Sequence, residues 1–237
     1  MKKIIFIISL AIIMIGCTMT QPIAKSEAYK GMYREKPVTV LLMPPINRST
    51  AVDAKEFFHS TLNVPIAEAG YYVIPTFLSM EILKRESAYD AELFLDAPLQ
   101  KFGDVFGADV ALFTIIHKWD KTYGMVYVDV EYIVKSTKTN EILFARRGDI
   151  SYNTTVQIQS AGGTYGALIA AVGSMVATTV ATAATKYVDV ARIANTYTFK
   201  DMPVGTYAPQ NVEEPNEIAG PKDFKVKLNG QYAGQYK

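Results

Sequence analysis

The first seventeen residues determine the compartment in which this chain must fold. Lys2 and Lys3 are followed by an almost unbroken apolar run from residue 4 to residue 15. A basic start, a short apolar stretch and a small residue before a cleavage site are typical of a secretory signal, and the run is too short to span a bilayer. We therefore expect the mature chain to fold outside the cytoplasm.

The cleavage site is specified by a cysteine. Residues 14–17 read Met-Ile-Gly-Cys and resemble the lipobox of bacterial lipoproteins. The resemblance implies removal of residues 1–16 and covalent lipid on Cys17, namely a diacylglyceryl thioether and an N-acyl chain such as palmitate. The alternative is an ordinary signal peptide with a chance cysteine. Thr18 follows, whereas Asp there would resemble an inner-membrane retention signal, so we expect an outer-membrane lipoprotein facing the periplasm.

Composition limits what the mature chain can do. Apolar residues make up 49% of the sequence and charged residues 20%, enough to bury a core. Removing Lys2 and Lys3 from the 24 basic side chains leaves 22 against 23 acidic ones, a net charge of −1 that argues against nucleic-acid binding. Cys17 is the only cysteine, so once it is lipidated no disulfide, cysteine metal ligand or cysteine nucleophile remains.

Hydrophobic patterns predict one α/β domain at residues 37–202, between a polar lipid tether at 17–36 and an irregular tail at 203–237. The expected strands, typically β-branched and apolar, are residues 38–43, 71–74, 110–119, 125–134 and 141–150. Apolar and polar side chains alternate along residues 125–134, so one side of that strand is expected to face water. The expected helices begin near residue 51, at residue 79 and after residue 96, and residues 186–198 form a helix or a strand. In the first helix, Phe58, Leu62 and Ile66 recur at four-residue spacing and predict a buried stripe, and Gly107 is expected to end the third. Two β-α units followed by a meander predict a mixed sheet of about five strands with helices on one face. In the tail, residues 225–231 around Asn229-Gly230 could form one exposed hairpin.

An uncharged segment from residue 150 to residue 185 has a centre rich in Gly, Ala, Ser and Thr. It is long enough to cross a bilayer, but these small residues favour insertion only weakly. We expect a closely packed helix instead, buried in the domain or in a subunit interface. Small residues recur there at four-residue spacing, as at a helix–helix contact, and predict a homo-oligomer interface: Gly166, Ala170, Ser174 and Thr178.

Side chains for catalysis or metal binding do not form a recognisable motif. His59 and His117 lie far apart, without a ligand at metal spacing, and His59 is expected on the exposed side of its helix. We expect no catalytic residue, no metal and no cofactor other than the lipid. One polar loop follows the first strand and precedes a helix, where an anion could bind; the alternative is a capped turn. Its residues are Asn47, Arg48, Ser49 and Thr50.

Three stretches together resemble a known family. Residues 42–47 read Leu-Met-Pro-Pro-Ile-Asn, residues 64–73 read Val-Pro-Ile-Ala-Glu-Ala-Gly-Tyr-Tyr-Val, and residues 106–112 read Phe-Gly-Ala-Asp-Val-Ala-Leu. They resemble a family of Gram-negative lipoproteins of unknown function that includes a meningococcal vaccine-candidate antigen. The resemblance implies a domain similar to the N-terminal domain of TolB and to curli-type secretion lipoproteins, and an association with such a secretion lipoprotein. It transfers no catalytic residues.

These observations predict a non-catalytic accessory or assembly component of an envelope secretion complex. Its partners would be the membrane, through the lipid, and an envelope secretion lipoprotein or other envelope proteins. A periplasmic small-ligand-binding module is the first alternative, and a hydrolase, for which the motifs are missing, is the second.

Overall fold

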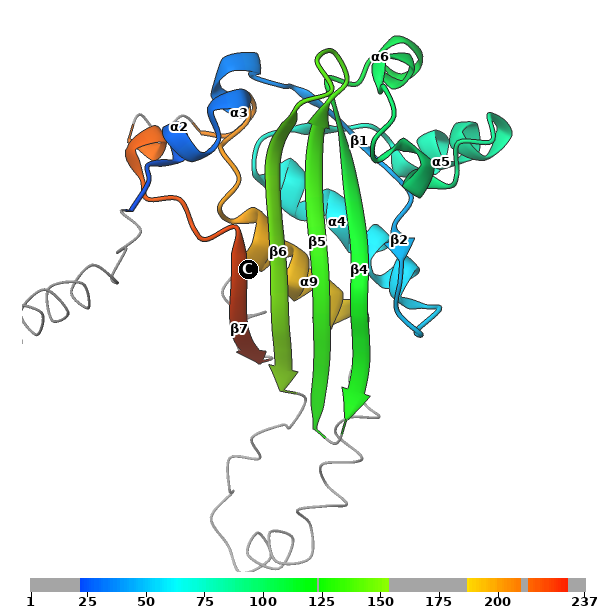
Figure 1. Cartoon of the computed structure of the whole chain (residues 1–237), viewed down its shortest axis with the longest axis vertical. Helices are drawn as coiled ribbons and strands as arrows, with labels where there is room; N and C mark the ends of the chain where they lie inside the picture. Colours follow the sequence, from blue (N-terminus) through cyan, green and yellow to red (C-terminus); the bar gives the residue numbers. More distant parts are fainter. Residues whose placement is uncertain (1–21, 123, 154–186, 210–212, 230–237) are drawn as a thin grey trace, which may run out of the picture.

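A mixed sheet of seven strands organises the protein, in the order β3-β1-β4-β5-β6-β7 with β2 paired to β4 (Figure 1). The computed structural model describes residues 22–122, 124–153, 187–209 and 213–229. The strands are β1 (Thr39–Leu42), β2 (Ile46–Asn47), β3 (Tyr72–Val73), β4 (Val110–Thr122), β5 (Met125–Ser136), β6 (Ile142–Asn153) and β7 (Asp223–Asn229). This confirms the mixed α/β class and all five expected strands, and it adds β2 and β7.

The strand directions follow from the length of the connections. β1 pairs parallel with β3 and β4, because helices cross between them, whereas β4, β5 and β6 form an antiparallel meander. Asn140 adopts a left-handed conformation, with φ of 63°, in the turn between β5 and β6. The expected alternation in β5 is confirmed: Val126, Val128 and Val130 are buried, while the residues between them are half-buried.

Two long helices, α4 (Ala54–Glu68) and α9 (Tyr187–Phe199), cover one face of this sheet (Figure 1). The predicted stripe of Phe58, Leu62 and Ile66 is completely buried against it. Residues 187–199 are therefore helical, which decides between the helix and the strand expected there. Trp119 of β4 packs edge-on against Phe58, at 5.6 Å between ring centroids.

Helices also cover part of the opposite face, which differs from the expected one-sided arrangement. The short elements α5 (Thr76–Arg85), η1 (Ala91–Phe94) and α6 (Gln100–Phe106) pack on β1 and on the beginning of β4. The reason lies in Leu41 of β1 and in Met43 just after it, which pack on the side opposite α4 and need cover of their own. Most of β5 and β6 stays uncovered on this side, and we call this area the open sheet face (Figure 1).

The segment expected as a polar tether contains two short helices, α2 (Lys25–Ala28) and α3 (Lys30–Glu35). Tyr29 and Met32 are buried in the main core. Lys25 is buried too, and two carboxylates compensate its charge: the ammonium group lies 3.3 Å from Glu214 and 2.9 Å from Glu217. Residues 25–35 are thus part of the domain, and no local pattern indicates this because the partners lie almost two hundred residues away.

The tail expected to be irregular contains η2 (Glu214–Asn216) and β7. β7 pairs parallel with β6 over seven residues, from Arg147 with Asp223 to Asn153 with Asn229. Phe224 and Leu228 are buried in the main core, which explains why this stretch joins the sheet. Residues 225–229, expected as the first arm of a hairpin around Asn229-Gly230, belong to β7, and the rest of that hairpin lies outside the described residues.

Candidate functional site

The polar loop after β1 forms a closed turn. The Asn47 carboxamide oxygen accepts hydrogen bonds from the backbone N–H of Ser49, at 3.0 Å, and from its hydroxyl, at 2.7 Å. The Asn47 amide group donates to the carbonyl of Ala51. Arg48 forms an ion pair with Glu92 at 2.6 Å. Asn47, Arg48 and Ser49 therefore satisfy each other or nearby groups, as in the capped-turn alternative, and Thr50 lies exposed in the same loop. Anion binding stays a prediction.

The two histidines lie on opposite sides of the sheet. His117 is at the β-bulge between Ile116 and Lys118, and its Nε2 lies 2.9 Å from Glu131 on the open sheet face. His59 is on α4, half-buried rather than exposed as expected, and its Nε2 has no hydrogen-bond partner among the described residues. Burial lowers the pKa of His59, because the charged imidazolium is poorly solvated there.

Charged side chains on the open sheet face pair across neighbouring strands. Arg147 of β6 donates two hydrogen bonds to Asp129 of β5, at 2.8 and 2.6 Å. Lys225 of β7 lies 3.0 Å from Asp149 of β6. The hydrogen bonds from Arg147 lower the pKa of Asp129. Such pairs are typical of the solvated face of an antiparallel sheet. Among the described residues, no group of three or more His, Cys, Asp or Glu side chains could hold a metal ion.

A charged network fastens the N-terminal helices to the rest of the protein. Glu214 accepts a hydrogen bond from the Tyr33 hydroxyl at 2.7 Å and pairs with Lys25. Burial and the nearby Glu214 carboxylate raise the pKa of Tyr33. The backbone joins the same two segments, since Ala24 bridges to Ile218. We call these contacts, together with those around Asp201 described next, the clasp.

A second part of the clasp lies beside α3 and α9. The Tyr29 hydroxyl donates to Asp201, and Asp201 also accepts from the backbone N–H of Gly220 at 2.9 Å. Arg146 of β6 completes this cluster, with Nε 3.8 Å from Asp201 and one guanidinium N–H donating to the carbonyl of Thr198. Both buried parts tie residues 25–33 to the C-terminal part of the chain.

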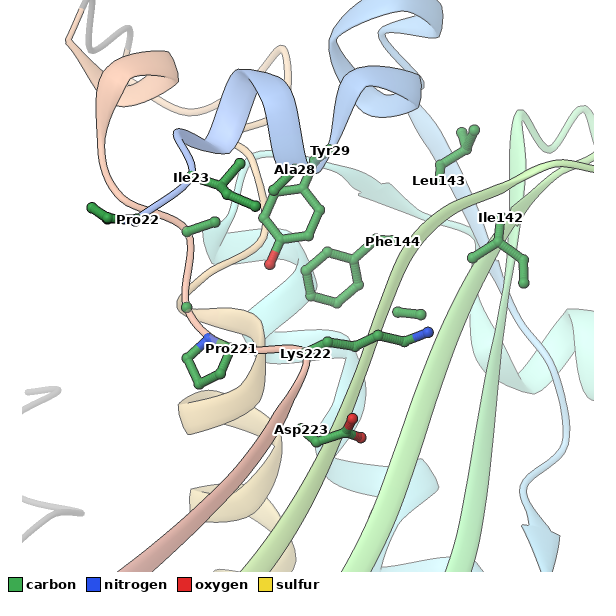
Figure 2. A pocket seen from close by; sticks show the side chains of 13 residues that line it. Pro22, Ile23, Ala28, Tyr29, Ile142, Leu143, Phe144, Pro221, Lys222 and Asp223 are labelled. Carbon is green, nitrogen blue, oxygen red and sulfur yellow. The ribbon is translucent and has the colours of Figure 1, made fainter. Parts of the chain in front are cut away.

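A groove of about 720 Å³ lies between α2 and the beginning of β6. Figure 2 shows the rings of Tyr29 and Phe144 side by side in it, with Ile23 and Ile142 to either side. The two rings are tilted, with centroids 5.1 Å apart. Residues 219–223 close the third side, where Lys222 and Asp223 supply the polar rim. The lining is mostly apolar, and we call this space the α2–β6 groove.

A smaller hollow of about 520 Å³ lies at the other edge of the sheet, beside β3. Asn63 and Ala67 of α4 line one side and residues 71–77 line the rest. Two aromatic side chains are exposed in it: Phe77 is 87% exposed and Tyr72 is 51% exposed. We call it the β3 hollow. An apolar residue near the start of an amphipathic helix normally suggests core packing, so the sequence did not indicate this surface.

Several predicted sites lie outside the described residues. These are the lipidation site Cys17 and the interface residues Gly166, Ala170, Ser174 and Thr178. Within the part of the chain that the structure describes, none of the helices is both long and apolar enough to cross a bilayer.

Comparison with known proteins identifies the family. A profile described as "Putative lipoprotein GNA1162-like" matches residues 27–205, about three quarters of the chain. The chain belongs to the GNA1162-like lipoprotein family. Membership of a lipoprotein family implies a membrane-anchored protein of the cell envelope, and it confirms the resemblance found in the three sequence stretches.

The individual proteins that this chain resembles share little sequence identity with it. The lipoprotein NMB1124/NMB1162 of Neisseria meningitidis serogroup B is 24% identical over 182 residues, covering 75% of this chain and 82% of that protein. The crystal structure of lipoprotein GNA1162 from Neisseria meningitidis is 22% identical, covers 57% of this chain and 95% of that one, and has a TM-score of 0.46. A PelC dodecamer from Paraburkholderia phytofirmans is 13% identical, with 62% and 83% covered and a TM-score of 0.32.

Two of the stretches that carry the resemblance to the GNA1162-like family have clear structural tasks. Gly70 has a φ of 91°, and a Cβ there would lie 2.3 Å from the backbone nitrogen of Ala208. Asp109 accepts hydrogen bonds from the backbone N–H groups of Val38 and Thr39 and so fixes the start of β1. Burial alone would raise its pKa, but these bonds and the one from Lys138 lower the pKa to about 2.

Proposed function

We propose that this protein is an outer-membrane-anchored lipoprotein, facing the periplasm, that acts by protein contact. Its role would be that of a non-catalytic accessory or assembly component of an envelope secretion complex. The β3 hollow is the observation that carries this proposal. Phe77, at 87% exposure, presents almost a whole aromatic ring to water, and Tyr72 lies beside the same depression.

Exposed aromatic side chains around a depression are typical of protein interfaces. Phe and Tyr are enriched there, and a few such anchors carry most of the binding free energy. Exposed apolar patches rimmed by polar residues also indicate sites of protein–protein contact. The charged groups of the open sheet face, by contrast, are engaged with each other, as His117 with Glu131 and Arg147 with Asp129.

The finer parts of the proposal rest on the sequence. Thr18 after Cys17 favours delivery to the outer membrane. The resemblance to the N-terminal domain of TolB and to curli-type secretion lipoproteins supports a secretion partner. Membership of the lipoprotein family supports the anchor.

Site-specific photocrosslinking in living cells tests the proposal. In the full-length lipoprotein, Phe77→p-benzoylphenylalanine should crosslink to a defined envelope protein. Phe77→Ala should reduce recovery of that partner by at least tenfold, because a central aromatic anchor contributes about 2 kcal/mol or more. Leu93→Ala is the matched control, since Leu93 is 68% exposed in η1 and does not line the β3 hollow. Equal recovery with both alanine variants would refute contact through the hollow.

A small-ligand-binding module is the second candidate, and the α2–β6 groove favours it. Its volume of about 720 Å³ is within the range of ligand sites, roughly 300–1,000 Å³. Native mass spectrometry of the non-lipidated Cys17→Ser chain, purified from cells, would support this candidate if one small molecule stays bound.

A further inference from the structure

The α2–β6 groove has the chemistry of a site for a hydrocarbon chain. Leu143, Phe144 and Ala145 of β6 form one wall, and Ile23, Ala28 and Tyr29 form the other. Ile23 is 45% exposed and Ile142 is 59% exposed, so apolar surface stays in water at both sides of the groove. An occupant without hydrogen-bonding groups would cover this surface and leave the polar rim at Lys222 and Asp223 in water.

The position of the groove indicates which hydrocarbon reaches it. The described chain begins at Pro22, and Pro22 itself lines the groove. Cys17 precedes Pro22 by five residues, which span at most about 17 Å when fully extended. An acyl chain fills one leaflet of a hydrocarbon core about 30 Å thick and is therefore about 15 Å long. A chain carried by Cys17 thus reaches the groove without any change in the described residues.

Covalent attachment favours this occupant over free lipid or another ligand. A group tethered by a short flexible linker has an effective concentration in the range of about millimolar at its site. The clasp holds Ile23 and α2 against residues 214–219, since Ala219 donates a backbone hydrogen bond to Ile23 and Lys25 pairs with Glu214. The wall that contains Ile23, Ala28 and Tyr29 is therefore held in place by contacts within the protein.

We propose that the α2–β6 groove binds one of the acyl chains attached to Cys17 of the same molecule. The proposal rests on the lipid anchor of the proposed function, and not on the secretion partner or on the β3 hollow. It assigns a binding role to Ile23 and to Ile142 at the mouth of the groove, with the nearly buried Leu143 and Phe144 as part of the wall.

A photoreactive lipid tests the proposal on the complete lipoprotein. Cells are fed a palmitate analogue that carries a diazirine near its end and an alkyne for capture, and the purified lipoprotein is irradiated in mild detergent. Mass spectrometry of the digested protein should find the label joined to peptides that contain residues 142–145 or 219–223. Mixing heavy and light isotope-labelled protein distinguishes crosslinks within one molecule from crosslinks between copies.

Two exposed aliphatic side chains supply a matched pair of variants. Ile142→Asp places a charge at the mouth of the groove and should reduce these crosslinks by about tenfold, the factor that corresponds to about 1.4 kcal/mol. Leu93→Asp should leave them unchanged, because Leu93 is 68% exposed, lies in η1 and does not line the groove. Both changes are at exposed positions, so circular dichroism should show two folded proteins.

Each other outcome overturns the proposal in a distinguishable way. Labelled protein that crosslinks only to phospholipid or detergent refutes the groove as the site and leaves the anchor intact. Crosslinks between two copies refute binding within one molecule. Protein that incorporates no label has no acyl chain on Cys17, and the groove proposal then fails together with the anchor.

Discussion

The clasp predicts a measurable coupling between the two ends of the domain. Its centre is the pair of Lys25 and Glu214, whose side chains are only 8% and 3% exposed and approach to 3.3 Å. Glu214 also accepts the Tyr33 hydroxyl at 2.7 Å. Glu214→Gln keeps the shape of the side chain and removes its charge, so that Lys25 keeps the half-exposed Glu217 as a charged partner.

The magnitude follows from the kind of interaction that each substitution removes. Hydrogen bonds to charged groups contribute about 1.5–3 kcal/mol, and removing one partner of a fully buried ion pair costs about 3–5 kcal/mol. Because Gln can still accept from Tyr33 and Glu217 stays near Lys25, we expect a loss of about 2 kcal/mol for Glu214→Gln. Lys25→Met should cost a similar amount. The double variant should lose at least about 1 kcal/mol less than the sum, since each change removes the same interaction.

Urea unfolding of the mature chain carrying Cys17→Ser measures these free energies, and hydrogen exchange shows where the effect occurs. Exchange should accelerate in residues 25–35 and 213–219 and change little in β4, β5 and β6. Glu68→Gln, an exposed change at the end of α4, is the control. Additive effects of Lys25→Met and Glu214→Gln, within about 0.5 kcal/mol, would refute the coupling.

Three further predictions concern other parts of the chain. Asp109 has a pKa of about 2 in the folded protein, below its usual value of 3.8, so its stabilising contribution is complete above about pH 4 and is lost as the pH falls toward 2. Asp109→Asn should therefore cost about 1–2 kcal/mol at pH 7, after discounting for partial exposure, and urea midpoints should then depend less on pH between 4 and 2. Asn195→Ala should cost about 3 kcal/mol in urea unfolding, because the buried amide donates to Phe58 and accepts from Tyr132; a loss below about 1 kcal/mol would contradict this network. Cys17→Ala should abolish palmitate labelling, and persistent labelling would place the lipid elsewhere.

The sequence predicted those elements whose pattern is local. Alternation in residues 125–134 identified β5, and the four-residue spacing of Phe58, Leu62 and Ile66 identified the buried face of α4. Both are periodicities set by the geometry of one element and hold whatever lies opposite. Gly107 as the end of α6 is equally local, since its φ of 65° suits glycine.

Contacts between distant segments could not be predicted in this way. In the sequence, Lys25 lies in a polar stretch and resembles any solvated lysine, and its burial beside Glu214 is evident only in the folded protein. β7 is recognisable as apolar and polar in alternation, but its parallel pairing with β6 depends on where residues 213–222 lead the chain. The α2–β6 groove combines three such distant segments, and Phe77 differs from a core phenylalanine only because no described element packs over it.

The two edges of the sheet limit the ways in which copies of this protein can join. β3 is only two residues long, and β7 carries Lys225 and Lys227 along its seven residues. Short edge strands and edge lysines both discourage backbone pairing with another sheet. Extension of the sheet from one molecule to the next, the first step towards fibres, is therefore disfavoured at either end. A lipoprotein concentrated on a membrane surface can in this way remain separate from its neighbours, because neither edge readily accepts a strand from another molecule.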